Sequence, residues 1–203
     1  MSSVVISGNT SGTVTLFAPD ISGTTVLTLP TANGTVITTG STFSGTGPAF
    51  SAYASASQTV TSNVPTKAAL DTKEWDTGTC FNNTGSTVTL NGLSVPSYSF
   101  CPNVAGYYQV NLQLRPTVSS GNIQNAYIEI YKNAALVYRL YEAGNSTLQT
   151  SGVSESGSCL IYLNGTGDYI GLYGSTVGSG TCSFNYSGTQ YTSRMQASLV
   201  RAG

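Results

Sequence analysis

Apolar and polar residues alternate along the chain between Tyr107 and Arg115. The alternate positions form two sets: Tyr108, Val110, Leu112 and Leu114, and Tyr107, Gln109, Asn111, Gln113 and Arg115. Because successive side chains of a β-strand point to opposite faces, this pattern predicts a strand with one buried face. We expect the first, mostly aliphatic set to face the core.

The segment from Ala126 to Tyr131 repeats the same period of two residues. The expected inward residues are Ala126, Ile128 and Ile130, and the expected outward residues are Tyr127, Glu129 and Tyr131. The residues at 132–135 then predict a chain reversal. Five further strands are expected at Leu136–Tyr141, Cys159–Leu163, Tyr169–Tyr173, Thr181–Tyr186 and Thr192–Val200. Since no segment shows a helical repeat, the pattern predicts an all-β sandwich or barrel.

The first forty residues show a different sequence pattern. They contain four short runs of Thr and aliphatic residues, at Val4–Ile6, Thr13–Phe17, Thr24–Leu29 and Thr35–Thr38. Four such short strands bury too little surface to be stable alone. We therefore expect residues 1–40 to form a small β-rich module that packs either against other proteins or copies of itself, or against the rest of its own chain. The Gly/Ser/Thr-rich residues 41–47 predict a linker, and residues 48–203, here called the knob, form the main domain.

The amino-acid composition argues against nucleic acid as a partner and against membrane insertion. Only 7% of the 203 residues are charged and the net charge is −1, so the chain offers no electrostatic basis for binding nucleic acid. The start, MSSVVISGN, lacks the features of a secretory signal peptide. No window approaches the roughly 18 consecutive apolar residues of a membrane helix. We expect synthesis in a cytoplasm and no membrane insertion.

Catalytic chemistry has little support in the sequence. Histidine is absent, which excludes Ser-His-Asp and Cys-His arrangements. The Gly-x-Gly segments at 45–47, 165–167 and 178–180 are not followed by the helix and lysine of a phosphate-binding loop. The eight acidic residues are scattered, which leaves open only a glycan-cleaving pair brought together by the fold. We expect no enzyme activity and no cofactor.

Six segments of the knob resemble, in the same order, the globular head of complement component 1q and its tumour-necrosis-factor-like relatives. They are PAFSAY (Pro48–Tyr53), TK…DT…EWDT (Thr66–Thr77), PNVAGYYQV (Pro102–Val110), IEIYKN (Ile128–Asn133), LNGTGDYIGLYG (Leu163–Gly174) and MQASLVR (Met195–Arg201). The resemblance implies a homotrimer of ten-strand jelly rolls whose first and last strands are adjacent. Residues 1–40 resemble the short β-rich modules of bacteriophage tail and head fibres.

Together these resemblances imply a phage virion-surface fibre protein. Residues 1–40 would bind other virion proteins, and the knob would attach to a glycan or outer-membrane protein of the host cell. Two alternatives remain open: a capsid decoration protein with a mainly structural role, and a soluble lectin-like binding protein.

The resemblance suggests roles for exposed aromatic residues, and the sequence itself suggests a receptor-binding loop. The outward tyrosines Tyr107, Tyr127 and Tyr131 are trimer-interface candidates, with a carbohydrate platform as the alternative reading. Trp75 is expected to be a packing anchor. Receptor-binding candidates surround the loop SGTQ at 187–190; they are Tyr186, Thr189, Gln190 and Tyr191.

Cysteines and acidic residues complete the candidate chemistry. The spacing of the four cysteines does not fit a zinc site. The resemblance implies the disulfides Cys80–Cys101 and Cys159–Cys182; the alternative is four buried thiols. Asp71, Glu74 and Asp76 form a weak calcium candidate because some relatives hold calcium with such oxygens. The alternative is a solvated acidic turn balanced by Lys67 and Lys73.

Overall fold

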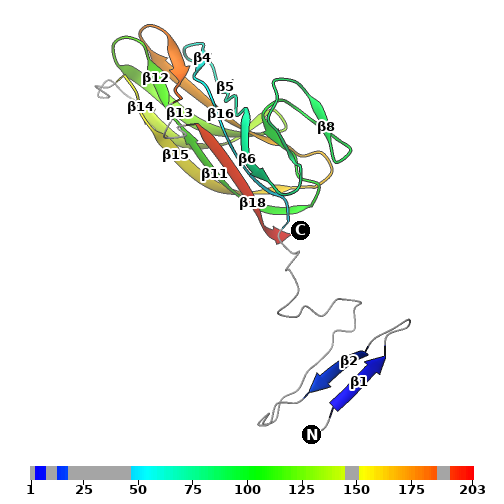
Figure 1. The fold of residues 1–203 in the computed structure, drawn as a ribbon. Helices are drawn as coiled ribbons and strands as arrows, with labels where there is room; N and C mark the ends of the chain where they lie inside the picture. The colour runs from blue at the N-terminus through cyan, green and yellow to red at the C-terminus, as the bar shows by residue number, and fades with distance from the viewer. Residues whose placement is uncertain (1–2, 8–12, 18–46, 145–150, 187–192) are drawn as a thin grey trace. The chain divides into compact units, whose positions relative to one another are not determined.

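The structure is a computed structural model that describes residues 3–7, 13–17, 47–144, 151–186 and 193–203 (Figure 1). The chain divides into two compact units, Met1–Thr42 and Phe43–Gly203. The described residues form strands, turns and bends, without a helix. None of these residues therefore belongs to a helix that could cross a membrane.

The described part of the N-terminal unit is a β-hairpin. Strands β1 (Ser3–Ser7) and β2 (Thr13–Phe17) pair antiparallel, with Ser7 opposite Thr13. They coincide with the first two runs expected from the sequence. The runs at 24–29 and 35–38, and the predicted limit between module and linker, lie outside the described residues. An isolated two-stranded hairpin is marginal in water, so the expectation that this unit packs against something else stays a prediction.

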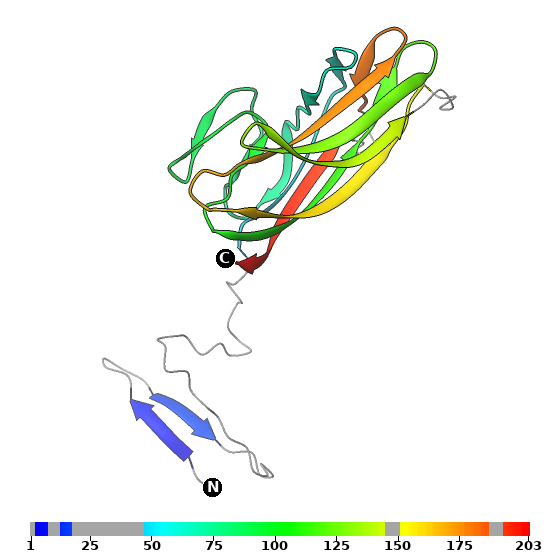
Figure 2. The same ribbon diagram turned by 180° about the vertical axis from the view of Figure 1, so that it is seen from behind.

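Two antiparallel sheets build the knob and face each other in Figures 1 and 2. The first has the order β15 (Glu155–Leu163), β11 (Gly106–Leu114), β18 (Arg194–Ala202), β3 (Ala49–Tyr53) and β6 (Thr72–Asp76). The second has the order β14 (Ala135–Gly144), β13 (Ile123–Lys132), β16 (Ile170–Gly178), β10 (Ser99–Phe100) and β7 (Phe81–Asn82), with β5 (Thr66–Lys67) beside β16. The first and last strands of the knob, β3 and β18, are adjacent, as the resemblance implied.

The strand order identifies the fold. The principal strands can be counted from one to eight as β3, β10, β11, β13, β14, β15, β16 and β18. One sheet then reads six, three, eight, one and the other five, four, seven, two. This interleaving of consecutive strands between two sheets is the jelly roll. The two sheets contain five and six strands, against the ten strands in total that the resemblance implied.

Two smaller sheets extend the knob. The first consists of β12 (Pro116–Val118), β17 (Cys182–Phe184) and β4 (Gln58–Val60), and the second of β8 (Val88–Leu90) and β9 (Leu93–Val95). Figures 1 and 2 show β12 and β4 at the end of the knob opposite the C-terminus.

The core lies between the two main sheets and confirms both predicted facings. The inward residues of both alternating segments are at most 3% exposed; they are Tyr108, Val110, Leu112, Leu114, Ala126, Ile128 and Ile130. Phe50 stacks on Phe81 and Phe100, with ring centroids 4.5 and 4.6 Å apart. Burial of such large apolar side chains is the main force that holds the two sheets together.

The outward residues of β13 correct one expectation. Tyr127 and Glu129 point away from the core, yet they are only 9% and 0% exposed. Arg139 on the neighbouring strand β14 covers both: its guanidinium carbon lies 4.1 Å from the centre of the Tyr127 ring, and its Nη2 lies 2.8 Å from Oε1 of Glu129. Strand alternation shows which side of a sheet a residue faces, but not whether a long neighbouring side chain covers it.

Candidate functional site

One end of the outer face of the first sheet carries an exposed apolar patch. It consists of Tyr107 on β11, Leu160 and Tyr162 on β15, and Val200 on β18, which are between 42% and 62% exposed. The rings of Tyr107 and Tyr162 meet edge to face, with centroids 5.4 Å apart. Tyr107, Leu160 and Val200, together with Arg201, also line a shallow concavity of about 300 Å³. Contiguous exposed apolar residues of this kind are typical of protein interfaces.

The rest of this outer face is polar but almost uncharged. Gln109 and Ser198 continue the cross-strand row that begins at Leu160 of the patch, and Ser158, Asn111 and Gln196 form the row beside it. In the next row the charge of Arg194 is balanced by an ion pair with Glu74. Because few ions would lose their water, such a face can be buried by another protein at low desolvation cost.

A second apolar surface lies on β14, which is an edge strand of the other sheet. Its side chains Leu136, Val137, Tyr138 and Tyr141 are between 39% and 47% exposed. A long, apolar edge strand can pair with other chains, so natural proteins cover or interrupt such edges. We call these four residues the β14 edge and the first group the apolar patch.

The three predicted interface tyrosines are not brought together. Tyr107 belongs to the apolar patch, whereas Tyr127 and Tyr131 lie on β13 in the other sheet. Tyr131 stacks on Tyr173, with ring centroids 4.0 Å apart. The neighbours of Tyr107 in the patch were not predicted, although Leu160 and Tyr162 alternate with the buried Ile161 and Leu163.

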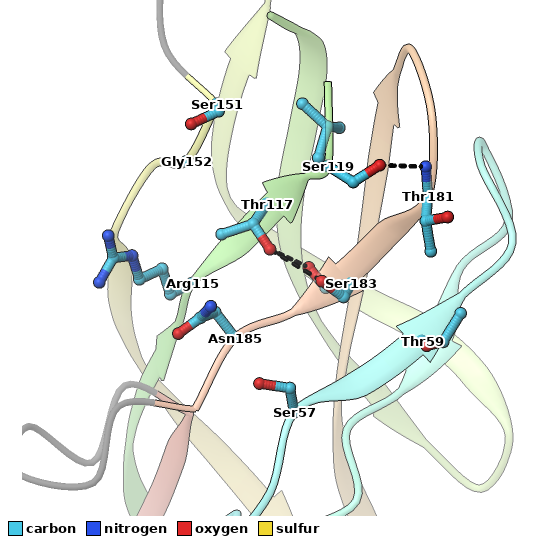
Figure 3. A pocket seen from close by; sticks show the side chains of 11 residues that line it. Ser57, Thr59, Arg115, Thr117, Ser119, Ser151, Gly152, Thr181, Ser183 and Asn185 are labelled. Carbon is cyan, nitrogen blue, oxygen red and sulfur yellow. Dashed lines mark hydrogen bonds between the residues drawn. The ribbon is translucent and has the colours of Figure 1, made fainter. Parts of the chain in front are cut away.

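A polar groove of about 480 Å³ lies on the three-stranded sheet at the end of the knob (Figure 3). Every outward position of this sheet that lines the groove has a hydroxyl, amide or guanidinium group. These residues are Ser57 and Thr59 from the β4 segment, Arg115, Thr117 and Ser119 from the β12 segment, and Thr181, Ser183 and Asn185 from the β17 segment. Ser151, Gly152 and the buried Val118 complete the lining. We call this site the tip groove.

The groove has a rigid floor because its inward positions belong to the core. Val60, Val118, Cys182 and Phe184 alternate with the groove residues and are buried. Hydrogen bonds tie the strands together on the outward side: the hydroxyl oxygens of Thr117 and Ser183 are 2.8 Å apart, and the Thr181 amide donates to Ser119 Oγ at 2.9 Å. Figure 3 shows both contacts across the centre of the site. The hydroxyls at alternate positions of these three segments are the sequence signal from which the groove could have been predicted.

Arg115 lies at the margin of the tip groove beside Gly152 (Figure 3). A Cβ atom at Gly152 would lie 3.0 Å from Thr117 Cγ2 and 3.7 Å from Arg115 Nε. Glycine therefore lets the 151–153 segment run close along β12, to which it is hydrogen bonded through the Val118 amide at 2.8 Å. This close approach forms the wall beside the guanidinium group.

Of the receptor-binding candidates, only Tyr186 lies within the described residues; Thr189, Gln190 and Tyr191 lie outside them. The Tyr186 amide donates to Ser57 Oγ at 2.9 Å. The predicted receptor segment thus begins beside the tip groove.

The three calcium candidates do not converge. Asp71 accepts hydrogen bonds from the Ser55 amide and hydroxyl at 2.8 and 2.6 Å. Glu74 pairs with Arg194, and Asp76 pairs with Lys73 at 3.3 Å. Of the two lysines expected nearby, Lys67 instead donates to Ser97 and Ser99. Among the residues that the structure describes, no cluster of His, Cys, Asp and Glu could hold a metal ion.

All four cysteines are free thiols in the structure; Cys80, Cys101 and Cys182 are buried, and Cys159 is partly buried. Cys159 lies on β15 of the first sheet and Cys182 on β17 of the three-stranded sheet, so this pair does not occupy neighbouring strands. Cys80 and Cys101 are close in the fold, since the Cys101 amide donates to the Cys80 carbonyl at 2.9 Å. Burial raises the pKa of Cys101 and of Cys159 to about 11.

Trp75 does not act as a core anchor in the single chain. It lies on β6 at the edge of the first sheet and is 44% exposed. The core beside this strand is instead formed by Phe50 and Ala52 of β3, which are fully buried.

Comparison with known proteins finds similarity at the level of structure only. No protein-family model matches the sequence, and no curated protein does either. The structure of Eiger TNF from S. frugiperda is 10% identical, with a TM-score of 0.46 over 77% of this chain and 93% of that chain. Murine APRIL at pH 5.0 is 8% identical (TM-score 0.47; 76% and 99%), and rabbit GITRL is 10% identical (TM-score 0.39; 77% and 96%). The strand order given above identifies the jelly roll independently of these likenesses.

Proposed function

We propose that this protein is a non-enzymatic fibre protein on the surface of a phage virion, and that its knobs form a homotrimer that attaches the particle to a host cell. Residues 1–40 bind other virion proteins, and the tip groove faces the cell. The observation that carries this proposal is the presence of two separate apolar surfaces, the apolar patch and the β14 edge, on a knob with little surface charge.

Two different surfaces favour a ring over a two-fold dimer. In a two-fold interface the same surface meets itself, whereas contact between two different surfaces repeats from one copy to the next and closes into a ring when the rotation allows. The β14 edge of one knob would cover the apolar patch of its neighbour. Three copies are the number that the resemblance of the sequence implies.

A trimer explains attachment through weak individual sites. Each knob presents one shallow, polar groove, and three linked grooves on many fibres convert later contacts into events at high effective concentration.

Labelling the protein within intact particles tests this proposal. An antibody against the knob should decorate the tips of tail or head fibres and should block adsorption to host cells. Label at regular positions of the capsid lattice without any effect on adsorption would instead assign a structural decoration role. Absence of the protein from purified particles would contradict both assignments and favour a soluble binding protein.

A further inference from the structure

The tip groove combines many neutral hydrogen-bonding groups with a single positive charge. Its lining contains no acidic residue and no aromatic ring. The volume of about 480 Å³ falls within the roughly 300–1,000 Å³ of small-molecule sites.

Arg115 is unusual among the cations of this chain. Four of the seven cations pair with carboxylates: Lys73, Lys132, Arg139 and Arg194. Lys67 donates hydrogen bonds to Ser97 and Ser99. Among the described residues, no carboxylate pairs with Arg115 or with Arg201, and of these two only Arg115 lines the groove. A cation without a carboxylate partner among the described residues, beside a rigid polar floor, is a natural site for an anionic group.

We propose that the tip groove binds a saccharide that carries a carboxylate, with Arg115 holding the carboxylate and the hydroxyls of Thr59, Thr117 and Ser183 holding the sugar hydroxyls. This inference deepens the proposed function, on which its biological meaning rests, because it names the class of cell-surface ligand. Binding of the saccharide can be measured with the purified protein alone, without the virion or the host cell.

The chemistry of both partners matches this assignment. A guanidinium group is planar and binds a carboxylate through two parallel hydrogen bonds. Each Ser or Thr hydroxyl can both donate and accept, as sugar hydroxyls also do. Thr59, Thr117 and Ser183 stand in one cross-strand row, so their hydroxyls present a line of such groups to an extended ligand. One guanidinium balances the single charge of a carboxylate, whereas a phosphate dianion would need a second cation.

Ligand-observed NMR titration of the full chain with a matched pair of sugars tests the proposal. Methyl β-D-glucuronide and methyl β-D-glucoside differ only in the carboxylate. We expect the glucuronide to bind about tenfold or more tightly, since a charged hydrogen bond is worth roughly 1.5–3 kcal/mol. Equal binding of the two sugars, or no binding of either, would overturn the proposal. Tighter binding of glucose 6-phosphate would overturn the choice of a carboxylate.

Variants locate the effect in the groove. Arg115→Gln should abolish the preference for the glucuronide, and Arg201→Gln, which removes the other cation that lacks a carboxylate partner among the described residues, should leave it intact. Arg115→Lys keeps the charge but loses the paired hydrogen bonds, so it should give an intermediate preference and serves as a second probe if Arg115→Gln fails to fold. Thr59→Val should weaken the binding of both sugars by a similar factor. A preference that survives both Arg115 variants would contradict the assignment.

The outcomes of this experiment and of the particle labelling are separable. Loss of the sugar proposal would leave the trimer and the virion location untouched. Absence of the protein from particles would leave a measured glucuronide preference valid for the purified protein.

Discussion

Arg139 covers two neighbouring side chains that point away from the core. Its guanidinium lies over Tyr127 and pairs with Glu129, so two side chains that point outward are buried. The sequence predicted the direction of both residues from the alternation of β13. Their burial depends on Arg139 of β14. The pairing register between β14 and β13 shifts twice, and such shifts have no signature in the sequence pattern.

Glu155 is a buried carboxylate in an unfavourable setting. It is 1% exposed, and neither side-chain oxygen has a hydrogen-bond partner among the described residues. Burial raises the pKa of this carboxyl from 4.5 to about 8. The folded chain therefore keeps a proton that the unfolded chain releases at lower pH, so stability falls as the pH rises from about 4.5 to 8 and then levels off.

We expect Glu155→Gln to remove most of this pH dependence. The variant should match the natural protein near pH 4.5 and should be more stable by several kcal/mol at pH 8, at about 1.4 kcal/mol per unit of pKa shift. Urea unfolding at a series of pH values and at fixed protein concentration measures the difference. Parallel curves for the two proteins would show that Glu155 keeps its ordinary pKa in the fold.

The thiols give a second prediction for individual residues. Under denaturing, non-reducing conditions a thiol reagent should find four free sulfurs per chain. In the folded protein, Cys101 and Cys159 should react slowly at pH 8, because burial holds their pKa near 11 and the thiolate is the reactive form. Two free sulfurs would show that one disulfide forms, and the proximity of Cys80 to Cys101 makes that pair the one to examine by mass spectrometry.

At the level of single strands, the sequence predicts where strands lie but not which strands pair. The five additional runs of β-forming residues all coincide with or overlap strands of the knob, namely β14, β15, β16, β17 and β18. Sequence alternation could not reveal which strands become neighbours, because pairing between strands distant in the chain depends on the whole core. For that reason the tip groove, built from three short strands far apart in sequence, was missed although its hydroxyls alternate regularly.

Strand β11 provides a direct test of facing. Leu112→Asp places a charge in the core, where it has no partner, and should prevent folding or lower the free energy of unfolding by several kcal/mol. Asn111→Asp changes the neighbouring, exposed position to the same residue and should leave the chain folded. Circular dichroism and urea unfolding distinguish the two variants. Similar stability of both would contradict the assigned facing, and a larger loss in Asn111→Asp would mean that the strand faces the other way.

The two apolar surfaces can be tested as elements of assembly. Leu160→Glu in the apolar patch and Tyr138→Glu in the β14 edge should each give a folded monomer, because burying a carboxylate without a partner opposes association. Thr89→Glu on β8, exposed and part of neither surface, is the matched control and should leave the assembly intact. Trimers in both apolar-surface variants would show that other residues form the interface.

At the scale of the whole molecule, the prediction is a closed assembly of three chains. Sedimentation equilibrium should give a mass near three times the 21.0 kDa of one chain, independent of concentration over a wide range if the interface is large. A mass of one or two chains would contradict the ring, and a mass that grows with concentration would indicate open, non-closing contacts between the same two surfaces.

The position of β3 determines how the knob would respond to force. This strand begins directly after the linker and is held on both sides, by β18 and by β6. Tension applied through the linker while the opposite end of the knob is held would run along the strand axis and load these hydrogen bonds in shear. Because bonds in shear must break together rather than one after another, the knob would resist detachment by fluid flow better than a domain whose first strand lies at a free edge and can be peeled away.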